Sequence, residues 1–415
     1  MAQSSTPLIS YWHPSMTYDF TLRVGQKDYS TDLVRVEIRS SVTTPYQHIF
    51  LDIFMDPRDV LSEELFGQQE MKLIIRLKGK LPESLEEVKF NLMYIDTEAD
   101  YRAGQQSAET DQVERGICRL KTVCIGAYQS MSTMVNAIYF NQTPGQIIRD
   151  LVSRTNAVDF NYDISGRSNL KIDQLLIPPT TLYNVVTYLD KTYGIFRGPM
   201  AFHATYDNKI KLQNLNKKPN SAQIVTLHLL STDGDSSSIT EAADPKVFYT
   251  KKPVINSYKG NAVFSVEAPT IRHIVKPRNS LAQTIETNLE TFSSKYGVIE
   301  KNNPKVHYNK LAIDNRRIGY DTNQTGYDTD QIFIQSNLSQ NISDLASTIA
   351  TVEGNLPTLN LMAIGEHVKL VSHSNDHIKL GGSYILKGTD IQFVKGTLWE
   401  SFSRLYMTRT NVASQ

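Results

Sequence analysis

The chain has 415 residues, which is too many for one compact core and predicts roughly two to four domains. Its 43 basic and 43 acidic residues cancel, so the composition argues against a protein whose main task is to grip nucleic acid with excess Lys and Arg. Hydrophobic residues make up 40% and charged residues 21%, as in ordinary folded soluble proteins. No run of about 18 apolar residues predicts a membrane span.

The two cysteines, Cys118 and Cys124, lie six positions apart in one predicted strand. Six strand steps cover roughly 20 Å, whereas a disulfide needs Cα atoms within about 7 Å. We therefore predict two free thiols and synthesis in a reducing, cytosolic compartment. The first ten residues lack the basic and apolar segments of a signal peptide, so none is expected.

Residues 1–128 are dominated by alternation of apolar and polar side chains. Such alternation places every second residue on a core, and several strands at this spacing favour an antiparallel barrel or sandwich. A short helix at about 57–66 and an exposed loop over 98–114 are expected to interrupt the strands. The runs are Tyr18, Phe20, Leu22 and Val24; Val34, Val36 and Ile38; Ile49, Leu51, Ile53 and Met55; Met71, Leu73, Ile75 and Leu77; Val88, Phe90, Leu92 and Tyr94; and a sixth over Gly116–Tyr128.

Residues 143–215 predict a compact module with few residues between its elements. Thr143 can cap a first helix with Pro144 at its first position. Thr181 can cap a second helix, which Gly194 would end. The other expected elements are a strand near 158–164, a connecting segment that Pro178 and Pro179 end, and strands near 200–205 and 209–215 joined by a tight turn at Asp207-Asn208.

The region from 231 to 355 predicts a loop over 231–246 and two further helices. Apolar spacing favours one helix over 280–296. A second helix is expected over 337–353, where apolar residues recur every four and three positions as in a heptad seam. We interpret this seam as docked on the protein's own core, with packing against copies of itself as the alternative. The expected strands of the C-terminal half lie near 247–249, 262–266, Val368 and Leu370, 383–394 and 398–408.

A local echo links the two β regions. Gly67–Leu73 and Gly365–Leu370 each contain Gly, then Glu, then Lys-Leu or Met-Lys-Leu entering a strand. Two related barrels flanking inserted α/β material would explain the echo, and so would chance similarity between strands of like composition.

No catalytic, cofactor-binding or metal-binding residue is predicted. The histidines His367, His373 and His377 lack the cysteines or helical spacing of a zinc site. The calcium-like segment that starts at Asp321 has Ile332 where an EF-hand needs a bidentate Glu. Carboxylates that a glycosidase would need cluster only in polar segments expected at the surface, namely Glu86, Glu87, Asp96, Glu98 and Asp100. Phosphate-binding and nucleophile motifs are absent from the sequence.

Three segments of the module carry a resemblance to a known family. They are Thr143-Pro144-x-x-Ile147-Ile148-x-x-Leu151, Thr181-Leu182-Tyr183-x-x-Val186-x-x-Leu189-Asp190-x-x-Tyr193-Gly194-Ile195, and Asp207-Asn208-Lys209-x-x-Leu212-x-Asn214-Leu215. The C-terminal run Gly365-Glu366-x-Val368-x-Leu370, followed by Gly382-Ser383-Tyr384-Ile385-Leu386, is similar too. In pattern and order, most of the chain resembles the baseplate hub proteins of contractile-tailed bacteriophages. The hub region of type VI secretion spike proteins is a related resemblance.

This resemblance implies a β-rich α+β fold with two antiparallel tube-like β-barrel domains and inserted α/β material. It implies a homotrimeric hollow ring that adapts a sixfold tail tube above to a threefold spike below and lets DNA pass as cargo. The chain stops after its last strand, so a separate spike protein is expected, together with other baseplate proteins and no membrane. The expected domains are a first barrel (1–128), the α/β insertion (129–230), a segment of strands, loops and two helices that partly completes the second barrel (231–355), and the last strands of that barrel (356–415).

Two other classes of function remain open from the sequence. One is a receptor-binding or distal-tail binding module, and the other is a cell-wall-cleaving tail enzyme. The absence of recognisable site chemistry favours the structural hub in the virion tail baseplate, assembled in the host cytoplasm, without catalysis.

Overall fold

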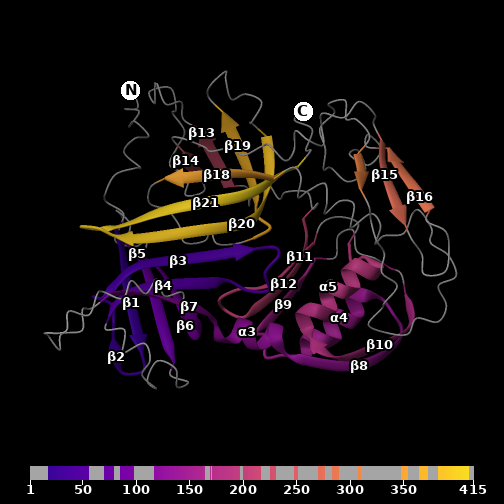
Figure 1. The fold of residues 1–415 in the computed structure, drawn as a ribbon, viewed down its shortest axis with the longest axis horizontal. Helices are drawn as coiled ribbons and strands as arrows, with labels where there is room; N and C mark the ends of the chain where they lie inside the picture. Colours follow the sequence, from indigo (N-terminus) through magenta and orange to yellow (C-terminus); the bar gives the residue numbers. More distant parts are fainter. Residues whose placement is uncertain are drawn as a thin grey trace, which may run out of the picture.

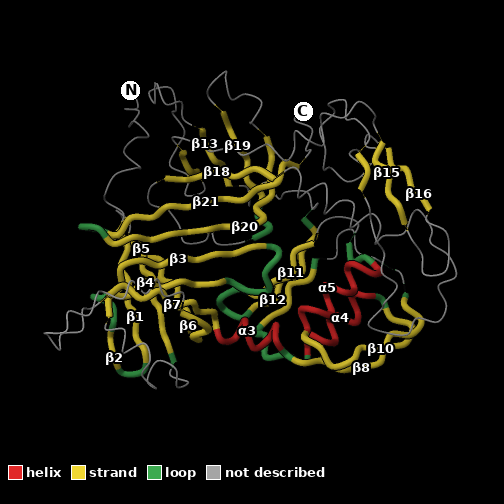
Figure 2. Tube along the Cα trace, in the orientation of Figure 1, coloured by secondary structure: helices red, strands yellow, loops and turns green. Residues whose placement is uncertain are grey.

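A computed structural model describes residues 17–55, 70–78, 85–97, 116–163, 169, 171–196, 200–215, 225–229, 247–250, 270–275, 283–288, 307–309, 347–353, 364–372 and 382–410. Within these ranges the chain is β-rich, and its helices gather in one region beside the strands (Figures 1 and 2). None of the helices in the described ranges has the length and apolar character that crossing a bilayer requires.

Thirteen strands form one large sheet, and its N-terminal part curls into a half-barrel. The strand order there is β3-β4-β7-β6-β5-β1-β2, and every neighbouring pair is antiparallel. The strands are β1 (Thr17–Val24), β2 (Lys27–Asp28), β3 (Leu33–Ser41), β4 (His48–Met55), β5 (Met71–Lys78), β6 (Leu85–Thr97) and β7 (Gly116–Cys124).

The long strand β20 (Gly382–Lys395) connects the N-terminal strands of the sheet to its C-terminal strands by pairing with both. Its second half pairs with β3, its first half pairs with β19 (His367–Ser372), and its other edge pairs with β21 (Trp399–Thr410). Beyond these lie β18 (Ser347–Glu353), β13 (Val225–Leu229) and β14 (Val247–Thr250). The expectation of a wholly antiparallel arrangement is wrong at β13, which runs parallel to both β14 and β19.

The residues that the alternation predicts to face the core are buried in β1. Tyr18, Phe20, Leu22 and Val24 are all buried. The Phe20 and Trp399 ring centroids lie 4.1 Å apart, and the Tyr18 hydroxyl lies 3.1 Å from Ser401 Oγ, so β1 packs against the start of β21.

Val34 departs from the pattern. It is only half-buried, while its neighbour Leu33 takes the core position. The pairing of β3 with β4 shifts register between Leu33 and Arg35, and this irregularity changes which residues face the core. Cys118 and Cys124 are buried free thiols in β7, as expected.

The two module helices form as predicted. Helix α4 (Pro144–Ser153) has a capping box between Thr143 and Gln146 with Pro144 in its first turn. Helix α5 (Leu182–Tyr193) is capped by the Thr181 side chain and ends at Gly194, whose φ of 72° favours glycine.

A helix replaces the end of the sixth predicted strand. The strand β7 stops at Cys124, and α3 (Ile125–Ser132) follows. The helix buries Ala127, Ser130 and Met131, whose spacing matches one helical face. A Cβ at Gly126 would lie 3.0 Å from Asn208 Cβ, so a glycine permits the close approach of α3 to the turn at Asn208.

Two strands of the α/β insertion (129–230), which includes the module, were missed by the sequence reasoning. Among the described strands, β8 (Met134–Gln142) pairs with β10 (Ile172–Thr181) alone, and β10 was expected as a connecting segment. Pro178 and Pro179 lie within a register shift of this pair, where their missing N–H groups cost no ladder hydrogen bonds. The predicted strands β9 (Asp159–Tyr162), β11 (Met200–Ala204) and β12 (Lys209–Asn214) are confirmed, as is the turn, where Asn208 has a φ of 58°.

The helices predicted for 280–296 and 337–353 are both wrong at the positions that the structure describes. Within 280–296, Gln283–Asn288 form strand β16, which pairs with β15 (Thr270–Val275); β17 (His307–Asn309) completes this small sheet. Within 337–353, Ser347–Glu353 form β18. Both strands are rich in β-branched residues, which favour strands once a pairing edge is available.

Several expectations lie outside the described residues. They are the helix at 57–66, the loops 98–114 and 231–246, the strand at 262–266, the calcium-like segment 321–332, and residues His373 and His377. Of the sequence echo, Met71–Leu73 fall in β5 and Val368–Leu370 in β19, which have different pairing partners.

Candidate functional site

The face of the large sheet that points away from the core carries an ionic network around Glu37. Strand alternation puts Val36 and Ile38 into the core and Glu37 on the opposite face. Glu37 is nevertheless only 1% exposed. Such burial of a carboxylate on an outward face requires side chains that cover it and neutralise it.

Three arginines perform that role. Arg119 Nη2 of β7 donates to Glu37 Oε2 at 2.6 Å, and Arg35 Nη2 donates to the same oxygen at 3.1 Å. Arg39 Nε donates to Glu37 Oε1. Burial would raise the pKa of Glu37, but the Arg119 and Arg39 guanidinium groups outweigh it and leave that pKa below its usual value. Glu37 is therefore ionised at neutral pH.

Phe50 lies directly across from Glu37 on β4. Its ring has Arg39 at 4.6 Å and Arg119 at 4.8 Å from the centroid. These are cation–π distances, and the two guanidinium groups keep the ring only 4% exposed. Arg39 and Arg119 are thus each held by both a carboxylate and an aromatic face.

The network extends onto β20 through Asp390, which pairs with Arg39 in register. Asp390 is 6% exposed. Burial raises the pKa of Asp390, and the nearby negative charge of Glu37 raises it further. The pKa values of the two carboxyl groups thus shift in opposite directions, since three arginines form ion pairs with Glu37, whereas burial and the charge of Glu37 outweigh Arg39 at Asp390.

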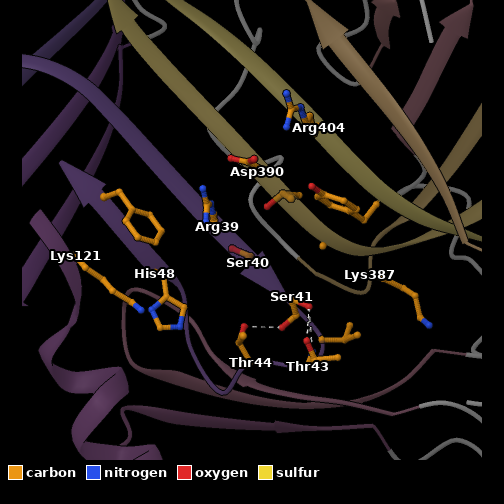
Figure 3. A pocket seen from close by; sticks show the side chains of 15 residues that line it. Arg39, Ser40, Ser41, Thr43, Thr44, His48, Lys121, Lys387, Asp390 and Arg404 are labelled. Carbon is orange, nitrogen blue, oxygen red and sulfur yellow. Dashed lines mark hydrogen bonds between the residues drawn. The ribbon is translucent and has the colours of Figure 1, made fainter. Parts of the chain in front are cut away.

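A hollow of about 640 Å³ lies next to this network, where β3 ends and turns into β4 (Figure 3). Each of five neighbouring strands contributes one basic side chain to its lining. These are Arg39 (β3), His48 (β4), Lys121 (β7), Lys387 (β20) and Arg404 (β21). Asp390 is the acidic side chain of the lining. The β3–β4 turn adds hydroxyl groups, and its Ser41 and Thr43 bond to each other at 2.8 Å.

The pKa of His48 depends on the burial and the positive charges of the hollow. Burial lowers the pKa of His48, and Lys121 and Arg39 lower it further. The imidazole is therefore neutral at pH 7. Its Nδ1 is buried and has no hydrogen-bond partner among the described residues.

Of the candidates considered from the sequence, the described ones lie apart, while Glu98, Asp100, His373 and His377 lie outside the described residues. Glu87 forms ion pairs with Arg76 at 2.7 Å and Lys89 at 2.8 Å. Asp96 lies opposite Lys121 in the β6–β7 pairing, and His367 begins β19. In the described part of the chain no group of three His, Cys, Asp or Glu side chains is placed to hold a metal ion.

Sequence reasoning missed the Glu37 network. The available signal was Arg35-Val36-Glu37-Ile38-Arg39, where charges of opposite sign alternate with core residues. This pattern indicates an outward face with charges that can pair, but it does not reveal Arg119, which lies 82 positions away along the chain.

Comparison with solved structures places the fold. No protein-family model and no curated protein sequence matches the chain. A tail protein from Neisseria meningitidis MC58 matches with a TM-score of 0.55 at 11% identity, covering 95% of this chain and 97% of that one. The 43 kDa tail protein of prophage MuSo2 from Shewanella oneidensis matches with a TM-score of 0.52 at 11% identity, covering 94% and 98%. An E. coli component of the type VI secretion system matches with a TM-score of 0.45 at 10% identity, covering 94% and 76%. The chain therefore shares its fold with the two tail proteins over nearly its whole length, which agrees with the sequence resemblance.

Proposed function

We propose that the protein is a structural hub of a phage tail baseplate. The observation that carries this proposal is the fold shared with two tail proteins across at least 94% of this chain and at least 97% of theirs. A likeness that covers both chains from end to end favours a common role for the whole protein over a shared module. The virion tail is the corresponding location, after assembly in the host cytoplasm.

We infer that the large sheet forms two tube-like barrels that share β20 and β21. The first would contain β3, β4, β7, β6, β5 and β1, closed where β1 packs against β21. The second would contain β14, β13, β19 and β18. In this proposal the segments 1–128 and 356–415 supply most of the barrels, 129–230 is the α/β insertion, and 231–355 completes the second barrel. Sharing two long strands would hold the barrels in a fixed relation.

Three copies of such a chain would form a hollow homotrimeric ring. Six barrels then present a sixfold surface to the tail tube protein above, and the trimer presents a threefold surface to a separate spike protein below. Other baseplate proteins would surround the ring, and DNA would pass through it as cargo. The equal numbers of basic and acidic residues support a conduit that does not retain DNA. No catalytic step is proposed.

Exposed apolar side chains support self-association. The outward face of β8 exposes Met134 by 62%, Ile138 by 56% and Phe140 by 62%. Large apolar residues gathered on one strand face usually mark a contact surface.

The mass of the purified chain in solution tests the proposal. Light scattering after gel filtration should give three times the chain mass of 46.9 kDa at micromolar concentration. A strict monomer without affinity for tube or spike proteins would contradict the hub. Zymography on cell-wall substrate is the second arm, and clearing by the purified protein would overturn the non-catalytic assignment.

A further inference from the structure

We propose that the hollow at the end of β3 binds side-chain carboxylates from an acidic segment of a neighbouring protein chain. The inference rests on the proposed tail assembly for the existence of that neighbour. The site itself is argued from the residues that line the hollow, shown in Figure 3.

The hollow contains a local excess of positive charge although the whole chain is neutral. Elsewhere on the same face, Arg35 and Arg119 form ion pairs with Glu37 at 3.1 Å and 2.6 Å. Lys121 and Arg404, which line the hollow, have no carboxylate within ion-pair distance in the described part of the chain. A negatively charged ligand would pair with these cations in the way that Glu37 pairs with the nearby arginines.

The imidazole of His48 favours the same ligand. His48 has a buried Nδ1 without a partner among the described residues, and its pKa is lowered by burial and then by Lys121 and Arg39. A seated anion would offset those two cations and favour the protonated imidazole. Asp390 is the acidic group that an anion would meet here, and burial and the charge of Glu37 raise its pKa above the usual value.

The shape of the site and its surroundings select carboxylates over nucleic acid. The basic groups lie around a recess, which a side chain on a peptide can enter and a duplex backbone cannot follow. A protein that tracks a nucleic acid presents a continuous basic groove. Here the neighbouring rows alternate in sign, as in the row Arg35, Asp52, Arg119 across β3, β4 and β7.

A fluorescein-labelled hexaglutamate peptide is the probe for this site. Its fluorescence anisotropy should rise on addition of the purified full chain at low salt, and the affinity should fall with added NaCl. The double variant K121Q/R404Q should bind at least about tenfold more weakly. The matched control K171Q/K369Q removes two cations outside the hollow, and its affinity should stay within about twofold of the parent chain.

A second readout reports the site directly. The imidazole resonances of the chain, with the His48 signal identified by its loss in H48Q, should show the pKa of His48 rising when the peptide binds. This readout does not depend on how the double variant folds.

Three results would overturn the inference. One is no binding of the peptide at low salt. Another is equal weakening in both double variants, since that indicates unspecific attraction. The third is tighter binding of a single-stranded hexanucleotide than of the peptide, with the same loss in K121Q/R404Q, which assigns the hollow to phosphodiesters. Each leaves the trimer mass unaffected, so failure here is distinguishable from failure of the hub proposal.

Discussion

The sheet around Glu37 and the β8–β10 sheet carry opposite kinds of side chain on their outward faces. Around Glu37 most outward side chains are charged, and three arginines each form an ion pair with the one glutamate. On β8 the outward side chains are Met134, Asn136, Ile138 and Phe140, and the strand carries no charge at all. The arginines of the Glu37 network find their carboxylate within the same chain, whereas the outward face of β8 exposes apolar surface. Outward-facing strand residues are therefore of two kinds: charged side chains that pair with one another within the chain, and apolar side chains that are exposed to solvent.

The largest effect is expected inside the module. Leu175 of β10 is fully buried, and the adjacent Leu176 points the other way and is half-buried. We expect L175A to lower the free energy of unfolding by about 2–4 kcal/mol because it leaves a cavity, and L176A to cost clearly less. Urea denaturation of both variants measures the difference. Equal losses would show that the two faces of β10 are not distinct.

A somewhat smaller loss is expected at the ionic network. E37Q removes the charge that holds three arginines, and we expect it to cost about 2–3 kcal/mol, reduced from the value for a fully buried pair because the arginines are partly solvated. The matched control is E87Q, which breaks a solvent-exposed pair with Arg76 and Lys89 and should change the urea midpoint little. If E37Q has the same free energy of unfolding as the parent chain, the ion pairs of Glu37 do not stabilise the fold.

Acid should destabilise the module through His203. This side chain of β11 is 3% exposed, and burial lowers its pKa to about 3, with a further lowering by Lys211. The unfolded chain takes up this proton below a pKa of about 6.5 and the folded chain does not, so stability falls as pH decreases between these values, by about 2 kcal/mol from pH 7 to pH 5. H203F should lose this part of the pH dependence. An unchanged slope of unfolding free energy against pH in H203F would contradict the assignment.

The smallest effect is expected on the outward face of β8. Phe140 is 62% exposed, so F140T should change the free energy of unfolding by no more than about 0.5 kcal/mol. The neighbouring Tyr139 is 5% exposed and its hydroxyl donates to Asp150 Oδ2 at 2.6 Å, so Y139A should cost much more. A large loss in F140T would place that ring in the module's own core.

Local signals explain which elements were predictable. The caps at Thr143, Thr181 and Gly194 act within one helical turn, so the sequence defines α4 and α5 without knowledge of the rest of the chain. Period-two alternation likewise locates β1, β4 and β5, because one core accepts their inward residues wherever the side chains are described.

Long-range pairing explains what was missed. The strand β10 contains two prolines that argue against a strand, and only its register shift against β8 accommodates them. The segment 347–353 has helical spacing, but its pairing with β21 makes it a strand. At the candidate site, Arg39 is recognisable beside Glu37, whereas Lys121, Lys387 and Arg404 converge on it only through the sheet. Such convergence depends on strand order, which local pattern does not contain.

Electron microscopy of the purified chain tests the central claim most directly. The hub account predicts particles with threefold symmetry around an open channel, built from three chains whose two β regions together give six similar lobes. A population of single compact particles without a channel, at concentrations where the protein is otherwise folded, would contradict it.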